Sequence, residues 1–134
     1  MASKSDAKSD AAGCGDLLDK RAVLQSLDEL RSFKTNWDGY GAAPLDPRNL
    51  DAAQRFVESL AENAAPTPKV VPMTRGRLQL EWHRGNRSLE LEFENPTMVH
   101  FLQWDSDRGI ETEDIVPIDQ TERLEGLVNW FTAE

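Results

Sequence analysis

Two histidines and several glutamates in the second half of the chain are the side chains best suited to chemistry. They are Glu81, His83, Glu90, Glu92 and His100. An imidazole ring and carboxylate groups can together hold a divalent metal ion. A row of glutamates on the flat face of a sheet is more often a solvated surface, because a flat face rarely makes ligands converge. We therefore expect no metal ion and no cofactor, and keep a ligand- or metal-binding domain as an alternative function.

The run Asp105-x-Asp107-x-Gly109-x-Glu111 resembles the start of a calcium-binding loop. Such a loop needs a glycine at its sixth position and a bidentate glutamate at its twelfth. Here the twelfth position is Val116, and the sixth is not glycine. The run therefore predicts no calcium site.

Nucleophilic catalysis lacks its usual sequence signatures. No serine stands in a glycine-flanked elbow, and only two histidines could serve as a base. Gly39-Tyr40-Gly41 follows an expected helix rather than a strand, and it lacks the lysine of a phosphate-binding loop. We therefore expect a protein that is not an enzyme.

The segment 36–44, NWDGYGAAP, places two large aromatic side chains among glycines. Asp38 before Gly39 indicates a tight turn. Trp37 and Tyr40 then have two interpretations. They pack on the core and set how the flanking helices cross, or they form a recognition surface, because Trp and Tyr are frequent binding hot spots.

The net charge of −9 limits the choice of partner. Binding to nucleic acid needs a concentrated basic face, whereas the stretch 90–125 is heavily acidic. We expect no direct nucleic-acid binding and a protein partner with a basic surface. The candidate partner-binding residues are Trp37, Asp38, Tyr40, Glu90, Glu92, Asp105, Asp107, Glu111 and Glu113.

Composition also bears on domains and location. Residues 1–12 are small, polar and charged, which predicts a disordered tail before a single α+β domain over 13–134. No apolar run approaches the ~18 residues of a membrane span, and no signal-peptide core is present. Cys14 is the only cysteine, which favours a reducing, cytoplasmic location and rules out an intramolecular disulfide.

Three helices are expected from the spacing of apolar residues. The first runs from Asp16, as its N-cap, to about Phe33. The second is capped by Asp46, has proline at its first position and ends near Asn63. Residues 64–72 contain three prolines and predict an extended connector. The third helix begins at Asp119, with an acidic capping-box analogue three residues on.

Strict alternation of apolar and polar residues on either side of Gly85-Asn86 predicts a β-hairpin with these two residues as its turn. Such a turn pairs residue 84 with residue 87, so the residue numbers of every cross-strand pair sum to 171. The register places six apolar residues on one face, as the pairs Trp82–Leu89, Leu80–Leu91 and Leu78–Phe93. On the other face it pairs Arg77 with Glu94, Gln79 with Glu92, and Glu81 with Glu90. A slip of one residue would destroy this separation.

A third strand, 98–104, follows a turn at Asn95-Pro96. A two-residue turn would place Met98, His100, Leu102 and Trp104 on the core face. A three-residue turn would bury Val99 and Phe101 instead. Residues 110–116 predict a fourth, edge strand. The expected fold is α+β in the order α-α-β-β-β-(β)-α, with two N-terminal helices, an antiparallel three- to four-stranded sheet and a C-terminal helix.

The NWDGYGAAP loop, the helix after it and the hairpin LQLEWHRGNRSLELEF together resemble an uncharacterised family of small bacterial proteins. Those proteins share an N-W-D-G-Y-G-A-x-P loop. The resemblance spans roughly residues 30–104 and implies a bacterial origin and a shared fold. It transfers no catalytic residue, and the acidic segment from Asp105 onward lies outside it.

These observations favour a non-enzymatic protein-interaction module, such as an antitoxin, an immunity protein or an accessory subunit. One alternative is a ligand- or metal-binding domain that uses the glutamate–histidine face of the sheet. Another is an acidic nucleic-acid mimic, in which the acids of 90–125 imitate phosphates and block a DNA- or RNA-binding protein.

Overall fold

The computed structural model describes residues 18–61 and 65–133. Its elements are α1 (Lys20–Leu30), α2 (Pro47–Ser59), β1 (Lys69–Pro72), β2 (Leu78–Arg84), β3 (Arg87–Asn95), β4 (Met98–Asp105), β5 (Ile110–Pro117) and α3 (Thr121–Thr132). The strands form one antiparallel sheet in the order β1-β2-β3-β4-β5. The expected α+β fold is confirmed. The expected tail over 1–12 and Cys14 lie outside the described residues.

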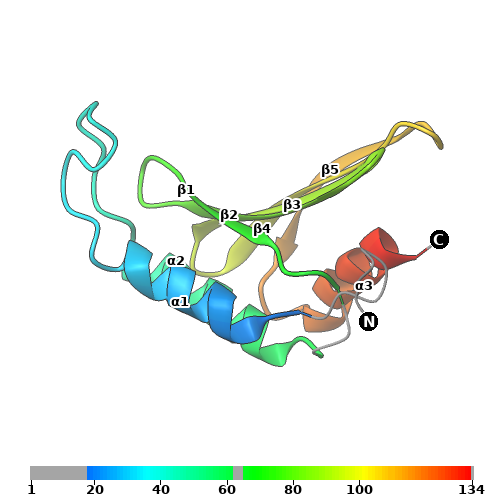
Figure 1. The fold of residues 1–134 in the computed structure, drawn as a ribbon, viewed down its shortest axis with the longest axis horizontal. Coiled ribbons are helices and arrows are strands. Elements are labelled where there is room, and N and C mark those ends of the chain that lie inside the picture. Colours follow the sequence, from blue (N-terminus) through cyan, green and yellow to red (C-terminus); the bar gives the residue numbers. More distant parts are fainter. Residues whose placement is uncertain (1–17, 62–64, 134) are drawn as a thin grey trace, which may run out of the picture.

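The three helices cover one face of the sheet (Figure 1). The core lies between these two layers, where α1 meets β1 and both α2 and α3 meet β3. In the part of the chain that the structure describes, no helix covers the opposite face, which we call the open face. None of the described helices is long and apolar enough to span a membrane.

The register of the β2–β3 hairpin is confirmed. Leu78 pairs with Phe93, Leu80 with Leu91, and Trp82 with Leu89. All six side chains are buried on the helix-covered face. The polar pairs Gln79–Glu92 and Glu81–Glu90 also form as expected on the open face. Arg77 precedes the strand, and its guanidinium binds Glu92 instead of Glu94, with Nη1 2.7 Å from Oε2.

The third strand buries Val99 and Phe101, which decides between the two registers. The tight turn closes on the pair Asn95–Met98, and a bulge between Phe93 and Asn95 then shifts the register by one residue. The Asn95 carboxamide stabilises this turn by accepting hydrogen bonds from the backbone N–H groups of Thr97 (2.9 Å) and Met98 (3.0 Å). A two-residue turn therefore produces the burial pattern expected from a three-residue turn, because the bulge adds one residue to β3.

The sheet has one strand more than expected. Lys69–Pro72, within the predicted connector, pairs with β2 as an edge strand. Its last residue is a proline, which an edge strand tolerates because one of its sides makes no ladder hydrogen bonds.

Three helix boundaries differ from expectation in the first half of the chain. The first helix, α1, ends at Leu30 rather than at about Phe33, because the N–H groups of Ser32 and Phe33 bond to carbonyls three residues back, as in turns. The N-cap of α1 is Asp19 rather than Asp16, because the Asp19 carboxylate accepts the N–H of Ala22 at 3.0 Å. Asp46 caps α2 as predicted, accepting the N–H of Arg48 at 2.9 Å. That helix ends at Ser59, because Leu60 adopts an extended conformation, and the predicted end near Asn63 is wrong.

The third helix begins at Thr121 with Gln120 as its N-cap, and no side chain caps it. The predicted start at Asp119 is therefore wrong. The apolar stripe is confirmed: Leu124, Leu127, Val128 and Phe131 are all buried against the sheet. The expected edge strand after the third strand is also confirmed as β5.

Candidate functional site

The loop between α1 and α2 is held in one shape by its own side chains. The Asp38 carboxylate accepts the N–H groups of Tyr40 (2.9 Å) and Ala42 (3.1 Å). The Asn36 carboxamide accepts the N–H of Gly41 at 2.7 Å. Gly41 has φ +83°, a conformation that L side chains rarely adopt. Hydrogen bonds from the loop's own side chains therefore hold its conformation. The loop extends beyond the helical layer at one end of the molecule (Figure 1).

The two aromatic residues of this loop have opposite environments. Trp37 packs against the core beside Phe33, with ring centroids 5.3 Å apart, and its indole N–H donates to the carbonyl of Ala43 at 2.8 Å. Tyr40 is 92% exposed. Trp37 is thus held by packing within the fold, whereas the Tyr40 side chain points into solvent. The Asp38 carboxylate serves the loop, and the N–H groups of Tyr40 and Ala42 lower its pKa.

The open face of the sheet joins apolar and acidic side chains. Strand pairing places Leu102 between Glu90 and Glu113, and Trp104 beside Glu111. Trp104 is 41% exposed and Ile115, farther along β5, is 46% exposed. An exposed apolar group with a polar rim is typical of an interaction surface.

His100 lies at the centre of the acidic part of this face. Its Nε2 is 2.8 Å from Oε2 of Glu113, and its Nδ1 is 3.9 Å from Oε1 of Glu92. Glu92 also binds Arg77, so part of its charge is neutralised within the fold. A shallow hollow of about 210 Å³ lies here, lined by Gln79, Glu90, Glu92, His100, Phe101, Leu102 and Glu113. The candidates Glu90, Glu92 and Glu113 are therefore brought together.

Asp105 lies on the other side of the sheet and is only 1% exposed. Its Oδ2 accepts hydrogen bonds from Arg87 at 3.1 Å and Arg108 at 2.9 Å. Burial alone would raise the pKa of Asp105, but the hydrogen bonds from Arg108 and Arg87 outweigh it and lower the pKa. Asp105 organises the β4–β5 turn and does not offer its carboxylate to a partner. Asp107, in the same turn, accepts from Asn86 at 2.6 Å.

The five glutamate and histidine residues considered as metal ligands lie in two separate groups on the open face. Glu81, His83 and Glu90 each bring a ligand atom to a point where all three lie within 4.8 Å of one another. Glu92 and His100 instead belong to the cluster around Glu113. The structure therefore leaves a compact set of one imidazole and two carboxylates.

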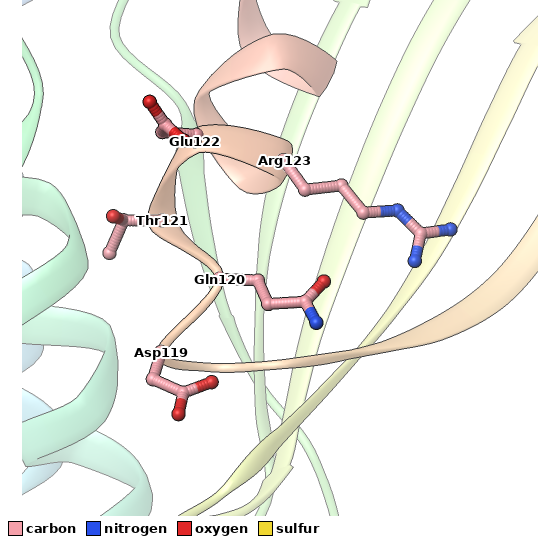
Figure 2. A pocket seen from close by; sticks show the side chains of 5 residues that line it. All are labelled: Asp119, Gln120, Thr121, Glu122 and Arg123. Carbon is pink, nitrogen blue, oxygen red and sulfur yellow. The ribbon is translucent and has the colours of Figure 1, made fainter.

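Another hollow lies at the start of α3 and is formed by Asp119, Gln120, Thr121, Glu122 and Arg123. Gln120 and Arg123 extend to one side of the chain there and Thr121 to the other (Figure 2). None of the candidate residues lines this hollow.

The apolar part of the open face was not among the predicted site residues. Leu102, Trp104 and Ile115 reach it because of the bulge in β3 and the pairing of β4 with β5. Alternation within 98–104 indicated two faces but did not distinguish the exposed one. Comparison with models of protein families, with curated proteins and with solved structures finds no match. Geometry and charge are therefore the basis for assigning a function.

Proposed function

We propose that this protein is a non-enzymatic interaction module that binds a protein with a basic surface through the open face of its sheet. The observation that carries the proposal is the exposure of Trp104 and Ile115 on a face that also presents Glu90, Glu111 and Glu113. Antitoxins, immunity proteins and accessory subunits work by such binding. The single cysteine supports a reducing, cytoplasmic location.

The composition of the open face favours a basic protein over other partners. Its acidic side chains are Glu81, Glu90, Glu92, Glu111 and Glu113, which share the face by strand pairing. Of the strand residues on this face, Lys69 is the one with a permanently cationic side chain. Acidic groups that lie beside exposed apolar side chains attract a cationic surface and then bury its apolar part. The same charges repel the phosphates of nucleic acid.

The C-terminal half of the β5 edge is protected against strand addition, which favours the face over the edge for docking. Ile118 donates its N–H to Thr97, so by alternation the N–H of Ile115 points away from β4. The Asp114 carboxylate accepts that N–H at 2.8 Å. Pro117, the next outward position along β5, has no N–H to offer. Such blunted edges are how native sheets avoid pairing with other chains.

The opposite edge of the sheet is short. β1 has four residues and ends at Pro72. A short edge that contains proline offers little backbone for pairing. Both edges therefore favour a partner that lies across the face, and Tyr40 on its preformed loop is placed as a second contact.

A pull-down from the source cell with charge-matched variants tests the proposal. Glu111→Lys changes the charge beside Trp104 on the open face, and Glu29→Lys makes the same change on an exposed position of α1. We expect wild type and Glu29→Lys to capture the same basic protein, and Glu111→Lys and Trp104→Ala to lose it. Circular dichroism must show that each variant is folded.

The purified pair should also dissociate as salt is raised, because the attraction is between exposed charges. Equal capture by Glu111→Lys and Glu29→Lys would show that the open face is not the docking surface. If wild type captures no partner, the function proposed here is wrong. A captured protein that itself binds DNA or RNA, and loses that ability in the complex, would favour the mimic interpretation.

A further inference from the structure

We propose that Glu81, His83 and Glu90 form a binding site for one divalent transition-metal ion of the zinc type. The ligand atoms of these three side chains lie within 4.8 Å of one another. The set goes beyond a group of acids, because an imidazole between two carboxylates is a ligand combination that such ions use. This inference is independent of the partner proposed above.

The sheet itself brings the three side chains together. Glu81 and His83 are two residues apart on β2, so they point to the same face. Glu90 on β3 is the direct cross-strand partner of Glu81. Opposite side chains in an antiparallel pair have Cβ atoms about 5 Å apart. Two central strands thus place the ligands, and a site on strands is held more firmly than one on loops.

The local electrostatics favour a bound cation. Glu81 and Glu90 carry like charges directly opposite each other, which is destabilising in a sheet. Among the described residues Glu90 makes no ion pair, and Lys69, opposite Glu81 on β1, pairs with neither carboxylate. A divalent ion between the two carboxylates would remove their repulsion.

The first carboxylate is already oriented for this role. Glu81 is mostly buried, with a side-chain exposure of 18%, and one of its oxygens accepts a hydrogen bond from the Gln79 amide. Its other oxygen, Oε1, lies 3.2 Å from Nε2 of His83. A ligating carboxylate that is hydrogen-bonded in this way is a regular feature of metal sites. The His83 side chain is 54% exposed, so an ion can reach its ring from solvent.

The ligand types indicate which ion fits. Zinc binds histidine nitrogen and carboxylate oxygen at about 2.0–2.2 Å, so the three ligands need to close only modestly around it. Magnesium and calcium prefer sites made of oxygen alone. Three protein ligands leave a tetrahedral ion one position for water. The proposal is therefore a site for zinc or a similar ion, selective against magnesium.

Calorimetric titration of the full chain with zinc chloride tests the site. The protein carries Cys14→Ser, which removes the only thiol, and no histidine tag. We expect one zinc ion per chain and no binding of magnesium chloride. His83→Ala and Glu90→Gln should each weaken zinc binding at least about tenfold. His100→Ala is the matched control, because it removes the other histidine of the same face and should leave zinc affinity unchanged.

Cobalt chloride gives a second measurement, because visible absorption reports the coordination of the ion. We expect an absorption band in the wild type and in His100→Ala, and a reduced band in His83→Ala. Absence of zinc heat and of a cobalt band in folded wild-type protein overturns the proposal. So does a His83→Ala variant that binds zinc as tightly as the wild type. Loss of partner binding in the separate pull-down would leave this result unaffected.

Discussion

The two faces of the sheet use alternate residues of the same strands and do so in opposite ways. On the helix-covered face, Leu80, Leu91 and Phe93 have no exposed surface. On the open face, their neighbours Glu81 and Glu90 are partly exposed. Because side chains alternate, a slip of one residue would exchange the two sets completely. The covered set determines the fold, and the open set is left free to carry a function.

The faces also differ in how they match charge. On the covered side, Arg87 binds Asp105 and donates to the Trp130 carbonyl at the end of α3. On the open side, Glu81 faces Glu90 and no described cation pairs with Glu90. Charge on the covered side thus serves the fold. On the open side Arg77 neutralises Glu92, and we propose that the remaining negative charge takes part in binding.

The largest effect is expected when the same substitution, leucine to alanine, is made on each of the two faces. Leu91→Ala should lower the free energy of unfolding by about 2–5 kcal/mol, because it leaves a cavity in the core. Leu102→Ala, on the open face, should cost well under half as much, because that side chain is only half-buried. Urea denaturation followed by circular dichroism measures both. A loss below ~0.5 kcal/mol for Leu91→Ala would contradict the packing of the core.

The ion pair on the covered side gives the next largest effect. Arg87→Ala should cost about 2–3 kcal/mol, because it leaves the Asp105 carboxylate with one fewer partner in a buried position. Arg108→Ala removes the exposed partner of the same carboxylate and should cost about 1 kcal/mol or less. Equal losses in thermal or urea unfolding would mean that burial does not distinguish the two arginines.

The loop after α1 repeats the contrast between inward and outward side chains. Trp37→Ala should destabilise by about 1–3 kcal/mol, less than a fully buried tryptophan, because its ring is partly exposed. Tyr40→Ala should change stability by less than about 0.5 kcal/mol, because its side chain packs on little. The pull-down should show the reverse order, with Tyr40→Ala weakening capture by a protein that remains fully stable.

Acid should act on carboxylates that serve the fold. Backbone N–H groups lower the pKa of Asp38, and Arg48 lowers that of Asp46. The pKa of Asp105 is lowered by Arg108 and Arg87. A lowered pKa in the folded state adds stability above the unfolded value of 3.8, which is lost as pH falls through the folded pKa. The urea concentration at which half of the protein is unfolded should therefore stay constant from pH 7 to about pH 5, and it should decrease below about pH 4. Asp105→Asn should flatten that fall.

Local patterns made the hairpin predictable and left its neighbours less certain. Six alternating apolar residues and a two-residue turn admit one register, so Leu80 and Leu91 could be paired from the sequence. The register of β4 depends on a bulge near Glu94, and no residue type marks where an extra residue enters a strand. β1 has four residues among prolines, and only its distant partner β2 makes it a strand.

The candidate site was predictable to a similar degree. Glu90, Glu111 and Glu113 follow from charge alone, and their place on one surface follows from the strands. Trp104 was named as a core residue in one of two registers, and the bulge turned it outward. Asp105 looked like its acidic neighbours in sequence, and only the approach of Arg87 and Arg108 shows that it is structural.

The smallest effect that we expect comes from the open face and depends on metal. In a chelating buffer, Glu90→Gln should be neutral or stabilise the protein by a few tenths of a kcal/mol, because it removes the repulsion with Glu81. With zinc present, the sign should reverse, because the wild type gains stability from bound metal and the variant loses a ligand. Thermal melts of wild type and Glu90→Gln, each with and without zinc, measure the effect of the substitution in both conditions. A marked destabilisation already in chelator would show that Glu90 supports the fold, and the open face would then resemble the covered one.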